Sequence, residues 1–200
     1  VQGISATIIT IEVNISKGIK FFLVGLPDNA VKESHERIIS ALQYNNIKVP
    51  RTQVVINMAP ADIKKEGTAY DLPLAIGMLA ANETLKPDLL SDYLIMGELS
   101  LDGTLKPIKG VLPIAIKARE LGFKGFILPK ENCREAAVVI NLDIHGAENI
   151  TDVIAFLNGE KDIEKTIKEN DEAAIAEKYA RENGYVKTDE RVYIDITPGT

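Results

Sequence analysis

The stretch that decides the fold reads Val54-Val55-Ile56-Asn57-Met58, then a polar loop, then Asp71-Leu72-Pro73-Leu74-Ala75-Ile76-Gly77-Met78-Leu79-Ala80-Ala81. The first part is a short apolar run with β-branched residues, which predicts a buried strand. The last part predicts a buried helix, because apolar side chains recur at helical spacing. Asp71 stands where an N-cap is expected, and Pro73 falls in the first turn, where a missing N–H costs nothing.

The loop between this strand and helix is polar and contains Lys64, Lys65, Gly67 and Thr68. A polar loop that leads from a strand into a helix N-terminus is a common way to build an anion site or an active site. A plain surface crossover has the same pattern, and the spacing alone favours that simpler interpretation.

Composition bounds the class of protein. The chain has 200 residues, of which 46% are hydrophobic and 26% are charged, which is typical of one good-sized globular domain plus an appendage. No apolar run has the length of a membrane span, and no signal peptide is expected, so we expect a cytoplasmic protein without membrane contact. The single cysteine, Cys133, excludes an internal disulfide and fits a reducing compartment. Two histidines without suitable spacing predict no metal site.

The charge is uneven along the chain. Residues 159–200 contain seven Lys and Arg against eleven Asp and Glu, a net of −4 out of −6, so residues 1–158 carry only −2. We therefore expect one domain over residues 1–158 and a charged extension or linker over residues 159–200, with a short strand at residues 192–194. The average charge shows no strong footprint for nucleic acid.

Before the central stretch, the pattern predicts strands over residues 4–15 and 19–24, joined as a hairpin. A helix is expected over residues 29–44, with Asp28 as N-cap and His35 at the rim. Gly25 does not begin a phosphate-binding P-loop, because the second Gly, the Lys and the Ser or Thr of that motif are absent.

After the central stretch, strands and helices alternate, so the expected fold is mixed α/β. Asp102-Gly103 predicts a hairpin turn. Thr151 is the expected cap of the last helix, and His145 is expected to be structural. The expected strands cover residues 93–99, 105–108, 125–128 and 142–146, and the expected helices cover residues 110–121, 131–139 and 151–157.

Several separate motifs then occur in one order that resembles the Lon-type protease domain. They are Lys65-Glu66-Gly67, Gly97-Glu98-Leu99-Ser100-Leu101-Asp102-Gly103, Pro107-Ile108 and Ile127-Leu128-Pro129-Lys130-Glu131-Asn132. The sequence is more similar still to the N-terminal domain of magnesium-chelatase-like proteins of the YifB and ComM type. That similarity includes Phe22-Leu23-Val24-Gly25-Leu26-Pro27 and Asn57-Met58-Ala59-Pro60-Ala61-Asp62.

This resemblance implies an α+β fold like domain 2 of ribosomal protein S5, shared with the proteolytic domain of Lon. It also implies a parent that is a ring-forming AAA+ ATPase acting on DNA, in competence or branch migration. ATP and Mg²⁺ are then expected for the parent, through a module that this chain lacks, and no cofactor is expected for the chain itself. The expected role of the chain is a non-catalytic scaffold and oligomerisation domain.

Laid on the Lon motifs, the sequence places Ala69 at the catalytic Ser and Leu112 at the catalytic Lys. Neither side chain can act as a nucleophile or as a base, because each is a hydrocarbon. The alternative is a hydrolase with a rearranged site built on Thr68 with Lys65 or Lys109. Thr68 is displaced by one residue from the Lon nucleophile position, and Lys109 is displaced by three residues from the Lon base position.

Lon-like domains in related ring ATPases can line a channel with Lys and Arg. The resemblance therefore gives candidates for contact with nucleic acid around the central loop and the neighbouring turn: Arg51, Lys64, Lys65, Lys106 and Lys109. A solvated loop surface is the alternative interpretation of the same residues.

Overall fold

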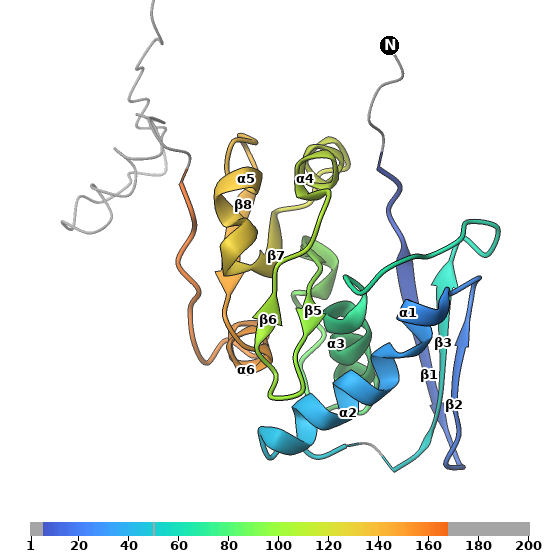
Figure 1. Ribbon diagram of the computed structural model, residues 1–200. Coiled ribbons are helices and arrows are strands. Elements are labelled where there is room, and N and C mark those ends of the chain that lie inside the picture. The colour runs from blue at the N-terminus through green and yellow to red at the C-terminus, as the bar shows by residue number, and fades with distance from the viewer. Residues whose placement is uncertain (1–5, 50, 168–200) are drawn as a thin grey trace, which may run out of the picture.

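The computed structural model describes residues 6–49 and 51–167, and it forms two three-stranded sheets, one hairpin and the helices that pack around them (Figure 1). The fold class is mixed α/β, as expected from the sequence. The predicted strand at residues 192–194 lies outside the described residues. No helix within the described ranges has both the length and the apolar character that crossing a membrane requires.

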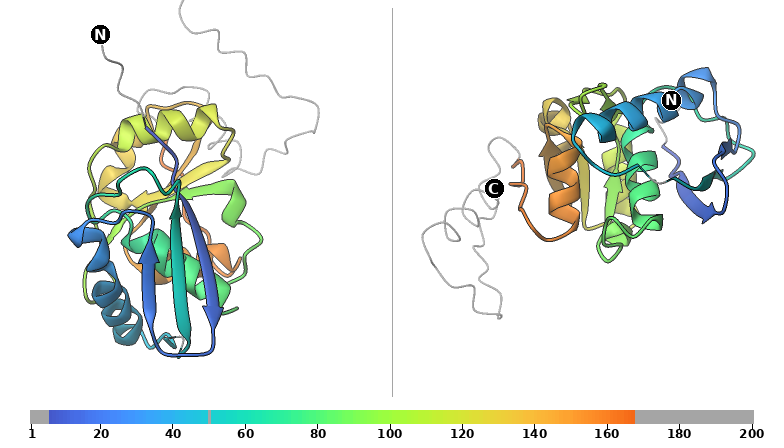
Figure 2. Two further views of the ribbon diagram at one scale, coloured as in Figure 1. Left: turned by 90° about the vertical axis from the view of Figure 1, so that its right-hand side faces the viewer. Right: turned by 90° about the horizontal axis from the view of Figure 1, so that it is seen from below.

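The N-terminal sheet has the strand order β1–β3–β2, with β1 antiparallel and β2 parallel to β3. Its strands are β1 (Thr10–Ser16), β2 (Phe21–Val24) and β3 (Gln53–Ala59). The predicted hairpin between the first two strands is therefore wrong. β3 is the most buried of the three, alternating between buried and half-buried positions, and it takes the central place between them. In the left view of Figure 2 this sheet faces the viewer, and no helix or strand of the described residues lies in front of it.

The crossover from β2 to β3 consists of α1 (Asn29–Lys32) and α2 (Ser34–Tyr44). Asp28 caps α1 as predicted, because its side chain accepts a hydrogen bond from the Val31 N–H. The single helix predicted over residues 29–44 is instead two helices that meet at Glu33. His35 is half-buried at the rim and its ring stacks on Phe21, with 4.2 Å between the ring centroids.

The second sheet is parallel throughout, with the order β4–β7–β8. All five residues of the central strand β7 are buried, and its three middle residues alternate between two hydrophobic clusters. Ile127 faces the larger cluster together with α3 and α6, whereas Phe126 and Leu128 face a smaller cluster with α4 and α5. The elements are β4 (Tyr93–Ile95), β7 (Gly125–Pro129), β8 (Asp143–Ala147), α3 (Asp71–Ala81), α4 (Val111–Glu120), α5 (Cys133–Ala136) and α6 (Ile150–Leu157).

Three further predictions need correction in this half of the chain. The strand expected over residues 93–99 is split between β4 and β5 (Glu98–Leu99), and β5 forms the predicted hairpin with β6 (Leu105–Lys106). The helix expected over residues 131–139 is instead a 3₁₀ turn, η2 (Lys130–Asn132), followed by the short helix α5. Another 3₁₀ turn, η1 (Leu90–Asp92), precedes β4. The cap of α6 is Asn149 rather than Thr151.

The folded body also extends past the expected boundary at Asn158. Ile163 is 8% exposed and belongs to the larger hydrophobic cluster, and the Thr166 N–H donates to the Ile144 carbonyl. The segment after α6 therefore packs along β8, the outer strand of the parallel sheet. His145 is buried and structural as predicted, with Nδ1 2.7 Å from the Ile163 carbonyl oxygen.

Candidate functional site

The central loop, residues 60–70, leaves β3 and leads into α3. Two backbone hydrogen bonds fix its middle to the segment between β2 and α1. The Asp28 N–H donates to the Lys65 carbonyl at 2.9 Å, and the Lys65 N–H donates to the Leu26 carbonyl at 3.0 Å. The Asp28 carboxylate also accepts from the Gly67 N–H. The hydrogen bond from Val31, with a smaller effect from Gly67, lowers the pKa of Asp28. The loop is thus held by backbone hydrogen bonds and by the Asp28 carboxylate.

Lys65 is fully buried, and its ammonium group donates to the Pro60 carbonyl of the same loop. This side chain closes the loop on itself and does not reach solvent. The prediction that Lys65 contacts nucleic acid is therefore wrong, and its amine also lies apart from any substrate that approaches from solvent. Nothing in the sequence distinguishes it from the exposed Lys64 next to it, which pairs with Glu66 at 3.1 Å.

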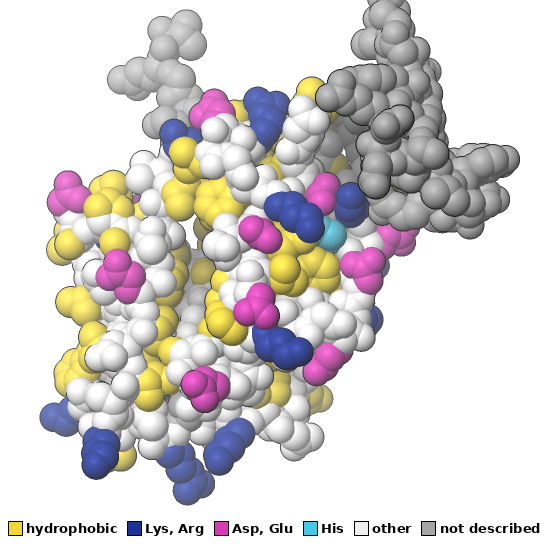
Figure 3. Space-filling model, turned by 180° about the vertical axis from the view of Figure 1, so that it is seen from behind, with side chains coloured by type: hydrophobic (Ala, Val, Ile, Leu, Met, Phe, Trp, Pro, Cys, Tyr) yellow, Lys and Arg dark blue, Asp and Glu magenta, His cyan; other side chains and the backbone are white. Residues whose placement is uncertain are grey.

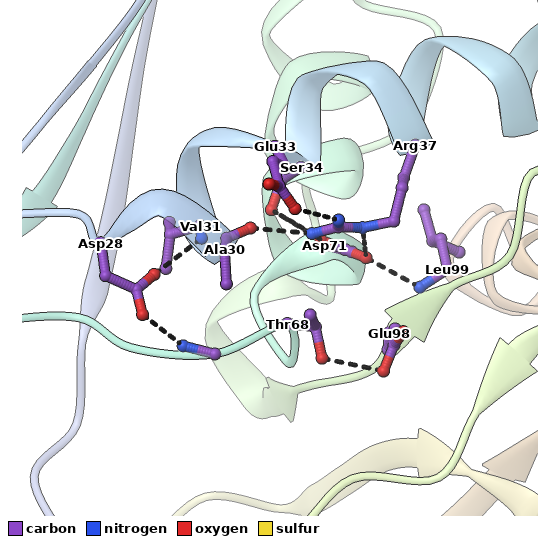
Figure 4. Close-up of polar contacts among 11 residues, drawn as sticks. Asp28, Ala30, Val31, Glu33, Ser34, Arg37, Thr68, Asp71, Glu98 and Leu99 are labelled. Carbon is purple, nitrogen blue, oxygen red and sulfur yellow. Dashed lines mark hydrogen bonds and ion pairs between the residues drawn. The ribbon is translucent and has the colours of Figure 1, made fainter.

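A buried polar network lies where the loop becomes α3 (Figure 4). Asp71 is completely buried, and both carboxylate oxygens accept two hydrogen bonds each. Ser34 Oγ donates to Oδ1 at 2.6 Å, Arg37 Nη2 to Oδ1 at 2.9 Å, Arg37 Nε to Oδ2 at 2.7 Å, and the Leu99 N–H to Oδ2 at 3.0 Å. This is a bidentate Arg–carboxylate pair, and the hydrogen bond to Asp71 raises the pKa of Arg37.

Asp71 is therefore not the N-cap that the sequence predicts. The helix begins at Asp71 itself, Tyr70 is the N-cap, and the carboxylate is directed to α2 and β5 instead of to its own helix. Because every lone pair of the carboxylate has a partner, the network joins three elements and offers no free group for chemistry.

The two positions that match the Lon catalytic pair are both filled by packing. Ala69 and Leu112 are half-buried, and both pack against the smaller hydrophobic cluster. The Ala69 carbonyl accepts from the Gly97 N–H at 2.9 Å. The N–H of Leu112, at the start of α4, donates to the Glu135 side chain on α5. Each side chain keeps some exposure, and each makes its apolar contacts with the smaller cluster.

The alternative catalytic pair is not assembled. Thr68 Oγ1 donates to the Glu98 carboxylate at 2.8 Å, so a carboxylate and not an amine is its partner. Among the described residues, no hydrogen bond joins Thr68 to Lys109, which is exposed just before α4. A hydroxyl that points its proton at a carboxylate is not activated by a lysine base.

The remaining candidates for nucleic-acid contact are distributed over two regions. Lys106 lies on β6, directly across from Glu98 in the hairpin, and Lys109 follows three residues later; both are exposed. Arg51 is exposed just before β3, at the opposite end of this strand from the central loop, and it lines an open groove together with Lys48. The structure thus does not bring Arg51 together with the central loop as the sequence prediction assumed.

Sequence reasoning missed Ser34 and Arg37 as members of the central network. They lie 37 and 34 residues from Asp71, and nothing in the local pattern sets them apart from the neighbouring polar residues His35 and Glu36. The only local signal was a carboxylate at the start of an otherwise apolar helix, and that signal also fits a cap.

The chain is similar in sequence to a known protein family and to several known proteins. The family model described as subunit ChlI of Mg-chelatase matches residues 11–132. The competence protein ComM of Haemophilus influenzae is 41% identical over 161 residues, which cover 80% of this chain and 31% of that protein. The protein YifB of Escherichia coli is 40% identical over 164 residues, 82% of this chain and 32% of that protein. This chain therefore spans about a third of the length of these relatives.

A more distant relation links the chain to proteases. Lon protease 2 of Bacillus subtilis is 30% identical over 112 residues, which cover 56% of this chain and 19% of that protein.

Proposed function

The chain belongs to the ChlI family of magnesium-chelatase subunits and is of the YifB and ComM type, and from this premise we propose that it is a non-catalytic scaffold domain. The observation that carries the proposal is the pair Ala69 and Leu112. Both are hydrocarbon side chains at the positions of the Lon nucleophile and base, and both pack against one hydrophobic cluster. A site of this kind contributes to packing and supplies neither a nucleophile nor a base.

The rearranged-hydrolase alternative is disfavoured by two contacts. The Thr68 hydroxyl is engaged by Glu98, and the Lys65 ammonium is enclosed within its own loop. Lys109, the other amine considered, is exposed. No candidate amine is therefore hydrogen-bonded to the candidate hydroxyl.

For the whole protein, we propose an AAA+ ATPase that uses ATP and Mg²⁺, assembles as a homo-oligomeric ring in the cytoplasm and acts on DNA. Support for this comes from the name of the competence protein ComM and from the magnesium-chelatase family itself. Within such a ring, the fully satisfied network at Asp71 would keep the domain rigid, which suits a scaffold.

A fluorophosphonate probe, which labels activated hydroxyl nucleophiles, tests the non-catalytic proposal. We expect no covalent labelling of the purified chain, with a serine hydrolase labelled in parallel as the positive control. Labelling that disappears in a Thr68→Val variant would show an activated Thr68 and would overturn the proposal.

A further inference from the structure

Four exposed cations lie at one end of the molecule, where the β1–β2 turn meets the segment that enters β3. We call this surface the basic end and define it by Lys17, Lys20, Lys48 and Arg51. None of the four takes part in an ion pair with another described residue. By contrast, five of the other lysines are paired: Lys64, Lys117, Lys130, Lys161 and Lys165.

Backbone contacts bring the two segments of the basic end together. The Val54 N–H donates to the Lys20 carbonyl at 2.9 Å, and Gly18 packs against the side chain of Gln53. Lys48 and Arg51 line one open groove together with Gln43, Ile47 and Val49. In Figure 3, Lys and Arg side chains project along the lower edge of the molecule.

The positive charge of the basic end is not offset nearby in the sequence, because no Asp or Glu stands among the residues that form it. Residues 13–27 and 37–61 contain no Asp or Glu, although the chain as a whole has a net charge of −6. The acidic residue that approaches this region is Asp102, whose backbone carbonyl accepts from Asn45 just after α2. The net negative charge of the chain would repel a polyanion. Any electrostatic attraction to a polyanion would therefore come from this local group of cations.

Two exposed apolar side chains flank the cations. Ile19 is 93% exposed in the β1–β2 turn, and Tyr44 is 70% exposed at the last position of α2, next to the groove residue Gln43. Cations that follow a phosphate backbone, combined with an aromatic ring on which a base can stack, are the chemistry of proteins that bind single strands.

We propose that the basic end binds single-stranded nucleic acid, with Lys17, Lys20, Lys48 and Arg51 at the phosphates and Tyr44 stacked on an unpaired base. This inference rests on the proposed action on DNA and moves the contact away from the central loop. In that loop Lys65 is buried and Lys64 is paired with Glu66, so the loop offers fewer free cations than the basic end.

The test is fluorescence anisotropy of a labelled oligothymidylate of about 20 nucleotides, titrated with the full chain over a range of salt concentrations. Neutralising about four phosphates of a single strand predicts a slope of log affinity against log salt of about −3. The triple variant Lys17→Glu, Lys48→Glu and Arg51→Glu should weaken binding at least tenfold and flatten this slope.

The matched control reverses the same number and type of charges at positions that are not candidates for nucleic-acid contact, as Lys86→Glu, Lys124→Glu and Arg119→Glu, and should leave binding within about twofold. All six positions are exposed, so both variants should fold, which circular dichroism checks. A milder triple variant with Gln at Lys17, Lys48 and Arg51 repeats the test if the Glu variant does not fold. Tyr44→Ala should weaken binding about tenfold with an unchanged salt slope.

Three outcomes would contradict specific parts of this account. Equal losses in the control variant would overturn the assignment to the basic end. Tighter binding of a duplex, together with no effect of Tyr44→Ala, would overturn the single-strand assignment. Absence of binding by the unaltered chain at low salt would count against the proposed contact of this domain with DNA itself, and not only against its location.

Discussion

Asp71 shows at the scale of one residue how a buried charge can hold a fold together. Its carboxylate is completely buried and accepts four hydrogen bonds, two of them from the Arg37 guanidinium. A buried ion pair contributes little beyond what apolar packing would provide, but removing one partner leaves the other charge without compensation. The side chain is therefore a point of sensitivity rather than a source of large net stability.

Asp71→Asn should lower the free energy of unfolding by about 3 kcal/mol. Arg37 would lose its counter-charge, and the NH2 group of the new amide would face hydrogen-bond donors that now have an acceptor. Urea denaturation followed by circular dichroism measures this. Glu33→Gln is the matched control: Glu33 also faces Arg37, but at 3.5 Å and largely in solvent, so its loss should cost under about 0.5 kcal/mol. Equal effects of the two substitutions would show that the buried pair has no special role.

His145 makes stability depend on pH. Burial lowers the pKa of His145, although the Ile163 carbonyl and the carboxylates of Asp143 and Asp162 oppose this and Lys165 adds to it. No group among residues 6–49 and 51–167 forms a hydrogen bond with the buried Nε2, so the neutral ring is the form that this part of the fold accommodates. Because the pKa is lower in the folded state, the unfolded chain binds the proton first as the pH falls below the ordinary histidine value of about 6.5.

Stability should therefore be constant with respect to this group above about pH 6.5 and should fall below it, by at most about 1.4 kcal/mol per pH unit. Unfolding free energies at several pH values between 7.5 and 5 test this, with His145→Gln as the comparison that removes the titrating group. His35→Gln serves as a control for a histidine at the rim. A His145→Gln variant with the same pH dependence as the unaltered chain would contradict this explanation.

At the residue scale, sequence reasoning succeeded where the interaction is local. Asp28 was predicted as a cap because its partner, Val31, lies three residues away. Asp71 and Lys65 were misassigned because the groups that decide their positions come from the tertiary structure: α2 and β5 for Asp71, and the closed loop conformation for Lys65. Periodicity carries no information about such partners.

The elements were mostly predicted, but their pairing and ends were not. Alternation identified β1 and β2 as strands, yet it could not show that β3 lies between them, since neighbours in sequence are the simplest pairing to assume. The break at Glu33 was missed because α1 has only 4 residues, too few for a change in periodicity to be visible before α2 begins. The hairpin of β5 and β6 was predicted correctly, because Asp102-Gly103 is a strong local turn signal.

The start of α6 gives a prediction at the scale of an element. Asn149 forms a capping box, in which its side chain accepts from the Thr151 N–H and its own N–H donates to Asp152. Asn149→Ala should cost about 1 kcal/mol of unfolding free energy, measured by thermal or urea denaturation. Thr151→Ala should cost less than half as much, because its hydroxyl only adds a hydrogen bond to the same Asn149 oxygen. The reverse order of the two costs would restore Thr151 as the cap.

For the whole molecule, the sequence predicted the fold class and the family, and the resemblance to Lon pointed to the two degenerate positions. It did not predict that the parallel sheet separates two hydrophobic clusters, or that Ile163 joins the larger one after the expected domain boundary. The boundary was placed by charge composition, and a single apolar side chain within a charged segment is a weak signal. Ala69 and Leu112, the two positions that the resemblance to Lon singles out, both pack against the smaller cluster.

The most direct test of this central claim is the turnover of unfolded casein by the purified chain, with and without Ala69→Ser. We predict no cleavage in either case, because the new hydroxyl would stand without a lysine base while Leu112 remains, and the two groups act as a unit. Lon protease assayed in parallel shows that the substrate is competent. Cleavage by the unaltered chain that is lost on Thr68→Val or Lys109→Ala would contradict the account and would favour a rearranged hydrolase.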